Sequence, residues 1–387
     1  MELSDVRRLT PAVQNIAYFC ASGFSPKPDP VVEEVAHWIK FQNQGPALPH
    51  VAAKMNEKFE ETRAKVATAF HADSTEIVLG ENTTVGINVV ANGFDWEAGD
   101  NIILSDEEHP GNLIPWYNIA RRHGVELRFA HANEDYTQFL EEFESLLDER
   151  TRVVSISHIS RYTGLRFPAR EMADLAHGRD VPLLLDGAQA FGSISVDVKA
   201  LDCDFYAFSG HKYIMAPQGT GGLYVRKDRV DWLKPSWIGS HSEREFDMVG
   251  NFELWDAAKR FEFGTRNLAD QAGLTRALEM WESIGWSQIF GYIREYSDRL
   301  KSALVTVPGM VLATPQTFEK SSGIVTFEIP GQKAETICSG LLEVEKILVS
   351  PVDYTSERIR VSTHVFNTDE EIERLVAGLN RICGQSV

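Results

Sequence analysis

The stretch FYAFSGHK at residues 205–212 is an apolar run that ends in Ser-Gly-His and then a lysine. Such a run predicts a buried strand, so Lys212 stands where the strand ends and water is scarce. A poorly solvated lysine has a lowered pKa and can act as an amine nucleophile or form an imine with an aldehyde. A lone lysine after a strand is more often a surface residue, so the functional interpretation depends on what surrounds it.

A second apolar run, VPLLLDGAQ at residues 181–189, brings Asp186 to its carboxyl end. Open parallel sheets bind their ligands at the carboxyl ends of strands, and Asp186 precedes Lys212 by about one strand-turn-strand unit. Pyridoxal 5′-phosphate chemistry has two fixed requirements, an aspartate that pairs with the protonated pyridine nitrogen and a lysine that forms an imine. The two runs together therefore indicate a site for this cofactor.

Apolar strands and amphipathic helices alternate through most of the chain, which is the pattern of a mostly parallel sheet covered on both faces. From about residue 286 the pattern changes to that of a smaller α+β domain. We therefore expect an α/β fold with an N-terminal arm at 1–30, a large domain at 31–265, and a small domain at 266–387 that begins with a long linking helix. Strands are expected at 76–80, 101–105, 125–130, 152–157, 221–225, 323–329, 347–349 and 358–363, and helices at 31–40, 52–70, 113–123, 138–147, 289–305, 334–342 and 369–382.

Composition restricts the partners. The chain has 387 residues and a formal net charge of −18, which argues against nucleic acid because that affinity comes mainly from Lys and Arg on phosphates. Cys20, Cys203, Cys338 and Cys383 are widely scattered, so neither a metal site nor a disulfide framework is indicated. The N-terminus lacks an apolar signal core and no stretch approaches a membrane span, so a cytoplasmic protein is expected.

Six short blocks carry a family resemblance: ENTT at 81–84, EHPGN at 108–112, DGAQ at 186–189, SGHK at 209–212, GT at 264–265 and RVS at 360–362. In their residues and order the chain resembles the pyridoxal-phosphate enzymes of the class V aminotransferase family from about residue 18 to its end. That family includes cysteine desulfurases, isopenicillin N epimerase and cyst(e)ine C-S lyases. The resemblance implies the fold type I architecture, with a mostly parallel seven-stranded-type sheet and a small C-terminal domain, and a homodimer with shared active sites.

The resemblance also implies roles at the cofactor ring. Lys212 would hold pyridoxal phosphate and later remove the α-proton of an amino-acid substrate. Asp186 would keep the ring nitrogen protonated, His109 would stack on the ring, and Gln189 would fix its tilt.

The cofactor phosphate would be bound by hydroxyl and imidazole groups from several blocks. By the resemblance these are Thr83, Thr84, Ser209 and His211, together with Thr265 of the neighbouring subunit. Thr83 and Thr84 also stand where a helix is expected to start, where free N-H groups favour an anion. The alternative for these two threonines is a simple helix cap.

Three further residues are candidates for binding the substrate. Arg360 alternates with apolar neighbours on a predicted strand, and the resemblance implies that it holds the α-carboxylate. Ser22 lies in the arm that covers the active-site mouth in this family, although a terminal loop is the alternative. Arg161 replaces the asparagine found in desulfurases, so it either binds a second carboxylate or is turned outward.

The expected reaction depends on a missing cysteine. A cysteine desulfurase needs a mobile cysteine before the carboxylate-binding arginine, but residues 341–360 contain none and Cys338 falls in a predicted helix. We therefore expect an enzyme that is not a desulfurase. The string at 106–111 looks most like that of cystine C-S lyases and of enzymes that process cysteine S-conjugates in lincosamide-type antibiotic pathways.

The resulting expectation is a carbon–sulfur lyase. It would act by β-elimination on cystine or a cysteine S-conjugate and give a thiol or persulfide, pyruvate and ammonia. Epimerisation and decarboxylation or transamination are the alternatives. A regulatory cofactor-binding protein would carry an added DNA-binding domain, and none is visible in this acidic chain.

Overall fold

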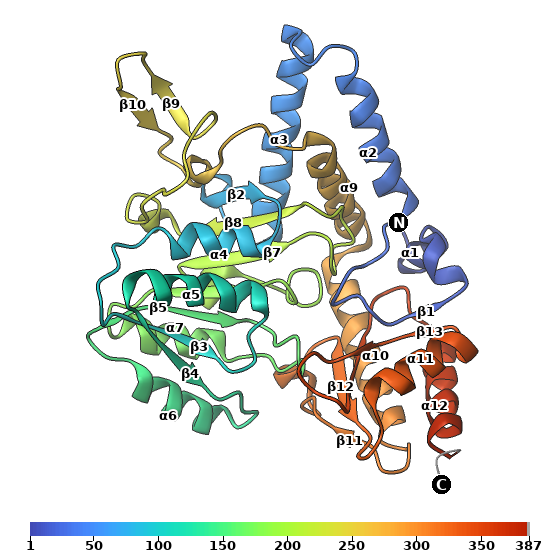
Figure 1. Ribbon diagram of the computed structural model, residues 1–387. Helices are drawn as coiled ribbons and strands as arrows, with labels where there is room; N and C mark the ends of the chain where they lie inside the picture. The colour runs from blue at the N-terminus through green and yellow to red at the C-terminus, as the bar shows by residue number, and fades with distance from the viewer. Residues whose placement is uncertain (385–387) are drawn as a thin grey trace.

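The computed structural model describes residues 1–384, and its largest feature is a seven-stranded sheet with helices on both faces (Figure 1). The strand order is β2-β8-β7-β6-β5-β3-β4. β8 is antiparallel to both of its neighbours, whereas the other neighbouring pairs are parallel. The strands are β2 (Ile77–Gly80), β3 (Asn101–Ser105), β4 (Glu126–Ala130), β5 (Thr151–Ser157), β6 (Leu183–Asp186), β7 (Phe205–Ser209) and β8 (Gly221–Val225).

Alternate side chains of each strand point to opposite faces of this sheet and are buried in different cores. In β6, Leu184 joins a core with Trp116 of α5, and Leu185 joins a second core with Met172 of α7. Because both faces are covered, the central strands are continuous apolar runs rather than alternating ones. The covering helices are α4 (Thr83–Ala91), α5 (Pro110–His123), α6 (Tyr136–Leu146), α7 (Ala169–His177), the short α8 (Val198–Leu201) and the long α9 (Leu268–Ile284).

A smaller antiparallel sheet with order β11-β12-β15-β14 forms the C-terminal part. On β15, Ile359 and Val361 are buried in the core of this part, so the side chain of Arg360 between them leaves from the opposite face. The elements are α10 (Trp286–Leu304), β11 (Val311–Leu312), β12 (Ile324–Glu328), α11 (Ala334–Glu345), β13 (Ile347–Leu348), β14 (Ser350–Pro351), β15 (Arg358–Ser362) and α12 (Asp369–Gly384).

The N-terminal segment packs against this C-terminal part, although the two are far apart in sequence. After α1 (Leu3–Arg8), strand β1 (Ala17–Tyr18) pairs in parallel with β13. Arg7 donates to Glu371 at 2.8 Å, and the N–H of Phe19 donates to the carbonyl of Leu348 at 2.9 Å. The chain then enters α2 (Asp29–Gln42) and α3 (Pro49–Ala69), which pack on α9 and project from one end of the molecule (Figure 1).

The expected fold class is confirmed, with most elements within a few residues of their predicted bounds. No strand is expected at 226–254, but the structure has a β-hairpin there, formed by β9 (Glu243–Phe246) and β10 (Phe252–Leu254), which projects from the same end of the molecule as α3 (Figure 1). The division into arm, large and small domains stays a prediction. Within residues 1–384 no helix is long and apolar enough to cross a membrane. The side chain of Cys383 lies outside the described part of the chain.

Candidate active site

A cavity of about 630 Å³ lies at the carboxyl ends of β6 and β7. The sequence segments that line it are hundreds of residues apart, since the arm, the large sheet and β15 all contribute. Its lining includes Ser22, Phe24, Asn82, Thr83, Thr84, His109, Arg161, Asp186, Gln189, Ser209, His211, Lys212 and Arg360. The structure therefore brings together every predicted site residue except Thr265.

Lys212 and Asp186 are the two ionisable groups at the centre of this cavity. Asp186 is the last residue of β6 and is 5% exposed, and its Oδ1 accepts from the N–H of Ala188 at 2.9 Å. Burial raises the pKa of Asp186, while the nearby ammonium of Lys212 opposes this shift. Desolvation lowers the pKa of Lys212 to about 8, helped by the charges of Arg161 and Arg360 and opposed by Asp186. A lysine with this pKa is uncharged in a useful fraction of molecules near neutral pH.

Close packing explains the glycine that follows Asp186. A Cβ at Gly187 would overlap the ring of Tyr206, so no larger residue fits here without moving β7. The hydroxyl of Tyr206 and Nδ1 of His158 are 2.9 Å apart, and the N–H of His158 donates to the carbonyl of Asp186 at 2.9 Å. The strand end that carries Asp186 is thus fixed from two sides.

Hydroxyl groups gather at the N-terminus of α4, beside the end of β7. Asn82 caps this helix by accepting from the N–H of Val85 at 3.1 Å. The hydroxyls of Thr83 and Ser209 are 2.7 Å apart, and the N–H of Thr83 donates to Ser209 Oγ at 3.0 Å. The helix dipole and these hydroxyls together make a cradle for a phosphate.

His109 lines the cavity as the N-cap residue of α5. Its Nδ1 accepts from the N–H of Gly111 at 2.8 Å, so the ring is a neutral imidazole with its proton on Nε2. Burial, with contributions from Lys212, Arg161 and Arg360, lowers the pKa of His109 to about 3. A neutral ring of this kind can lie against an aromatic cofactor.

Arg360 and Arg161 stand together on the side of the cavity next to β15. Arg360 is 6% exposed, and its Nη1 donates to the backbone carbonyl of Arg161 at 3.1 Å. The Nη2 of Arg161 donates to Asp353 Oδ2 at 2.6 Å. Ser22 reaches the same region, where its hydroxyl contacts that of Ser362. Arg161 therefore lines the cavity rather than pointing outward.

The cavity carries unused hydrogen-bonding capacity. Among the described residues there is no partner for Gln189 Oε1, His211 Nδ1 or Arg360 Nε, although all three atoms are buried and their residues line the cavity. Buried polar atoms in native proteins are normally paired, so these three indicate a polar ligand. With the buried carboxylate of Asp186, the phosphate cradle and the amine of Lys212, the residues fit pyridoxal phosphate and an amino acid.

Thr265 lies elsewhere in the subunit. With Gly264 it lines a separate cavity of about 420 Å³ whose other walls include Arg63 and Glu262. There Glu262 is buried, accepts from the N–H of Leu79 at 2.7 Å, and is paired with Arg63. Within one chain, Thr265 therefore cannot contribute to the cavity that contains Lys212.

The comparison with known families matches this geometry. The protein-family model described as aminotransferase class-V matches residues 17–375 of this chain. The chain belongs to the class V aminotransferase family. Pyridoxal 5′-phosphate is its cofactor, as the sequence predicts.

Individual relatives are similar over almost their whole length. A cysteine desulfurase of Escherichia coli is 36% identical, with 95% of this chain and 93% of that protein covered. The apo structure of a cysteine desulfurase from Thermococcus onnurineus NA1 has a TM-score of 0.89 and 27% identity, covering 98% of each chain. The cystine C-S lyase C-DES with its reaction product cysteine persulfide has a TM-score of 0.90 and 28% identity, covering 96% of this chain and 99% of that one. A C-DES mutant with glycine covalently linked to the PLP cofactor is equally similar, with a TM-score of 0.90, 28% identity, and 97% and 98% coverage.

These relatives confirm a pyridoxal-phosphate-dependent carbon–sulfur lyase of this family. They also correct the expected function: the exclusion of cysteine desulfurases is wrong. The expectation of β-elimination on cystine or a cysteine S-conjugate depended on that exclusion and falls with it. None of these four comparisons names a protein of antibiotic biosynthesis, so that expectation is not supported.

The exclusion considered cysteines only within one segment of sequence. In the structure Cys20 of the arm reaches that segment from outside, with its Sγ 3.1 Å from Ser350 Oγ and 3.7 Å from the carbonyl of Leu348. Residue spacing along a chain cannot reveal a thiol contributed by a segment more than 300 residues away.

Sequence reasoning also missed three residues around the cavity. Asn82 belongs to a quoted block, and its position before two threonines is a readable N-cap signal. Phe24 lines the mouth and packs against the ring of His211, with 5.4 Å between ring centroids. Asp353 contacts Arg161 across 192 positions of sequence, and no local pattern marks it.

Proposed function

We propose that the protein is a cysteine desulfurase, which removes the sulfur of L-cysteine and passes it to an acceptor thiol. One observation carries the proposal: a single cavity holds Lys212, Asp186 and Arg360 in a chain that is 36% identical over 95% of its length to a cysteine desulfurase. The bound cofactor would supply an electron sink for the carbanion at Cα. The protein groups bind, orient and move protons around that centre.

Each group has one task in this proposal. Arg360 binds the α-carboxylate of the substrate with the part of its guanidinium that has no protein partner, and so fixes the amino acid against Lys212. The uncharged Nζ of Lys212 then accepts the α-proton, which its lowered pKa makes possible near neutral pH. Asp186 would hold a proton at the ring nitrogen of the cofactor, and His109, a neutral imidazole, would lie against the ring. Thr83, Thr84, Ser209 and His211 would bind the phosphate.

The N-terminal arm closes one side of the cavity in which this reaction would occur. Gln189 donates through Nε2 to the carbonyl of Ser22 at 3.0 Å, which ties the arm to the loop after β6. Ser22 and Phe24 then cover the mouth and exclude water from the reacting centre. Because this loop directly follows Asp186, a displaced arm would disturb both the cover of the cavity and a residue that binds the cofactor.

Electron counting separates desulfuration from simple elimination. If the sulfur of L-cysteine bonds to an acceptor thiol as a persulfide, the bond to Cβ breaks with both electrons left on carbon, and the product is L-alanine. If sulfur leaves as hydrosulfide with the bonding electrons, the carbon skeleton becomes pyruvate and ammonia. The ratio of alanine to pyruvate therefore reports which reaction occurs.

The test is to incubate the holoenzyme with L-cysteine and excess dithiothreitol and to quantify alanine, pyruvate and sulfide. We expect one alanine for each sulfide released and little pyruvate. Lys212→Ala is expected to form neither product, and borohydride should label Lys212 in the wild type only. Pyruvate as the main product would refute the proposal.

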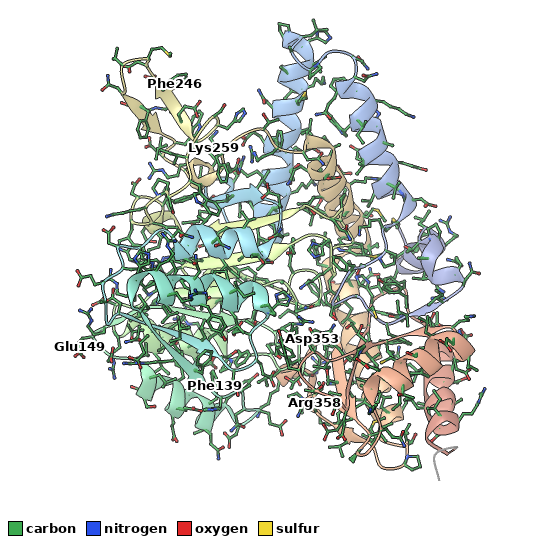
Figure 2. All side chains as sticks on the ribbon, in the orientation of Figure 1. Phe139, Glu149, Phe246, Lys259, Asp353 and Arg358 are labelled. Atoms are coloured by element: carbon green, nitrogen blue, oxygen red, sulfur yellow. The ribbon has the colours of Figure 1, made fainter. Side chains whose placement is uncertain are left out.

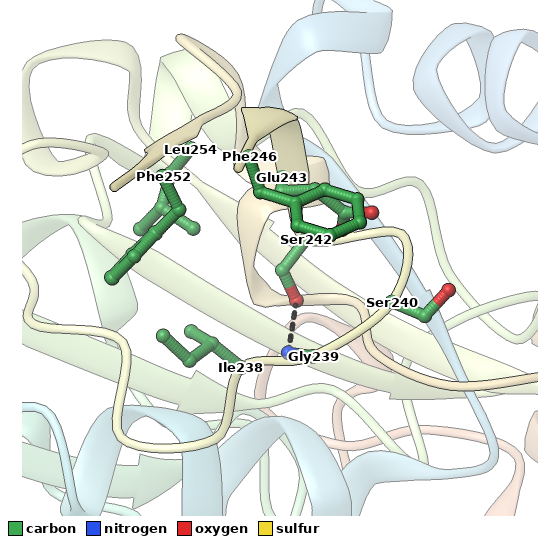
Figure 3. Close-up of a pocket in the computed structure, with 8 residues that line it drawn as sticks. All are labelled: Ile238, Gly239, Ser240, Ser242, Glu243, Phe246, Phe252 and Leu254. Carbon is green, nitrogen blue, oxygen red and sulfur yellow. Dashed lines mark hydrogen bonds between the residues drawn. The ribbon is translucent and has the colours of Figure 1, made fainter. Parts of the chain in front are cut away.

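We also propose a homodimer in which each subunit completes the site of the other. The proposal is supported by the position of Thr265 outside the cavity of its own chain. A further support is the β9–β10 hairpin, on which Met248 and Val249 are 92% and 85% exposed. A cavity of about 290 Å³ lies below the hairpin, with the apolar side chains of Ile238, Phe246, Phe252 and Leu254 around it (Figure 3). Exposed apolar surface of this extent is typical of an interface.

Mixed subunits test the shared site. Lys212→Ala and Thr265→Arg proteins are each expected to be inactive, because every site lacks one group. A hybrid dimer has one site with both groups intact, so random mixing should restore about a quarter of wild-type activity. Absence of restoration in verified hybrids would show that each site is self-contained.

The proposed reaction also suggests a subcellular location. A persulfide acceptor must be a reduced thiol, and thiols stay reduced in the cytosol. We therefore propose a cytosolic enzyme, and recovery of the protein in an oxidising compartment would contradict this.

A further inference from the structure

The ion pair between Arg161 and Asp353 joins the cavity to a surface turn. Arg161 lies in the turn after β5 and lines the cavity, while Asp353 lies between β14 and β15. Their Nη2 and Oδ2 atoms are 2.6 Å apart. The Arg161 side chain is 15% exposed and that of Asp353 is 53% exposed, so the pair runs from the cavity to solvent. Figure 2 shows Asp353 near Arg358, where the large and small parts of the molecule meet.

The backbone around Arg161 is fixed independently of this pair. Its carbonyl accepts from Arg360, and Thr326 Oγ1 donates to the next carbonyl, that of Tyr162, at 2.7 Å. The guanidinium of Arg161 also lies over the ring of Tyr162, 5.4 Å from the centroid. Removal of Asp353 would therefore release the guanidinium without moving the chain that carries it.

The charges around the cavity leave Arg161 without another anion. Among the residues that line the cavity, Asp186 is the one carboxylate, against the three side chains of Lys212, Arg360 and Arg161. In the proposed function the phosphate cradle binds one anion and Arg360 binds the α-carboxylate. The guanidinium of Arg161 then faces the remaining part of the substrate, its side chain, and Asp353 is the protein group that occupies it.

We propose that Asp353 is a specificity-determining residue: by pairing with Arg161 it makes the site select amino acids with an uncharged sulfur substituent over those with an anionic one. This rests on the proposed function and deepens it. A neutral thiol, as in L-cysteine, leaves the ion pair intact. A sulfinate or carboxylate at the same place must displace Asp353 before it can bind Arg161.

The ion pair between Arg161 and Asp353 is strong enough to discriminate between neutral and anionic side chains, and weak enough for an anionic ligand to displace Asp353. A partly exposed ion pair changes an equilibrium by up to about fivefold, because solvent screens its charges. Loss of the Asp353 charge should therefore raise the preference for an anionic side chain by about three- to fivefold. Without Arg161, the residue at position 353 should no longer affect the preference between neutral and anionic side chains.

The test measures binding rather than turnover, so it does not depend on desulfuration. The absorbance of the bound cofactor is titrated with two pairs of nearly isosteric ligands, L-aspartate with L-asparagine, and S-carboxymethyl-cysteine with S-carbamoylmethyl-cysteine. The two pairs differ in how far the charge lies from Cα. For Asp353→Asn, the ratio of neutral to anionic Kd should rise about three- to fivefold in at least one pair.

Two further variants make the result specific. Glu357→Gln is the matched control: it removes one negative charge from the same turn, and its carboxylate accepts from the N–H of Gly331 rather than from Arg161. Its ratio should stay within twofold of wild type, and in an Arg161→Asn background Asp353→Asn should have no further effect. The proposal is overturned if Asp353→Asn leaves both ratios unchanged, or if Glu357→Gln shifts them equally. If the binding ratios change as expected but the protein forms pyruvate from L-cysteine, only the proposed reaction is refuted.

Discussion

Replacement of Arg360 by lysine is expected to lower kcat/KM for L-cysteine about 10- to 150-fold. In the structure Nη1 of Arg360 is used by the carbonyl of Arg161 at 3.1 Å, while Nε is buried without a partner among the described residues. A lysine ammonium keeps the charge but cannot hold that carbonyl and also make a planar two-point contact with a carboxylate. The loss of one charge-assisted hydrogen bond costs about 1.5–3 kcal/mol. At about 1.4 kcal/mol for each factor of ten, this gives the stated range.

The measurement is the initial rate of alanine formation against L-cysteine concentration at fixed dithiothreitol. Arg358→Lys is a matched control on the same strand, because Arg358 pairs with Glu328 at 3.3 Å and does not line the cavity. Its kcat/KM should stay within about twofold of wild type, since surface pairs contribute little. A change of less than threefold in Arg360→Lys, or an equal loss in Arg358→Lys, would refute the assignment of the carboxylate to Arg360.

Three other outcomes are expected. Asp186→Asn should lower kcat on the order of 10²- to 10³-fold and cofactor affinity far less, because the proton on the ring nitrogen matters most when carbanion charge develops. Equal losses of kcat and of cofactor affinity would show that Asp186 is mainly a binding group. The rate at which apo-protein covalently captures pyridoxal phosphate should rise with pH and level off above about pH 8, because the pKa of Lys212 is lowered from 10.5 to about 8 and only the uncharged amine reacts. A capture rate, measured by stopped-flow absorbance, that still increases at pH 10 would contradict this. Cys20→Ser should keep sulfide release to dithiothreitol within about twofold, because burial raises the pKa of the Cys20 thiol and leaves it protonated; a loss above tenfold would instead show that Cys20 accepts the sulfur.

The centre of the candidate site could be predicted from the sequence because it depends on strand ends. In a mostly parallel sheet the carboxyl ends of neighbouring strands meet at one edge, so apolar runs that end in Asp186 and near Lys212 must bring these residues together. The helix start at Thr83 is an equally local signal, because an asparagine before a helix is a typical N-cap, and Asn82 caps α4 in the structure. Fold class and cofactor therefore followed from short-range patterns.

Contacts between distant turns could not be predicted in this way. Arg161 and Asp353 meet because two loops from different sheets face each other, and neither loop has a periodicity that fixes its direction. The β9–β10 hairpin was missed for a related reason. Its strands have only 4 and 3 residues, too few for the alternation by which a strand is recognised in a sequence. Cys20 shows the same limit, since its position beside Ser350 could not be predicted from residue spacing along the chain.

The pairing of β1 with β13 sets the order in which the molecule can be completed. Residues 17–18 leave the ribosome early, but their hydrogen-bonding partners at 347–348 are among the last to be made. During most of synthesis the N-terminal segment has no strand to join, so the wall of the cavity that includes Ser22 and Phe24 can be completed only after the last part of the chain has been made.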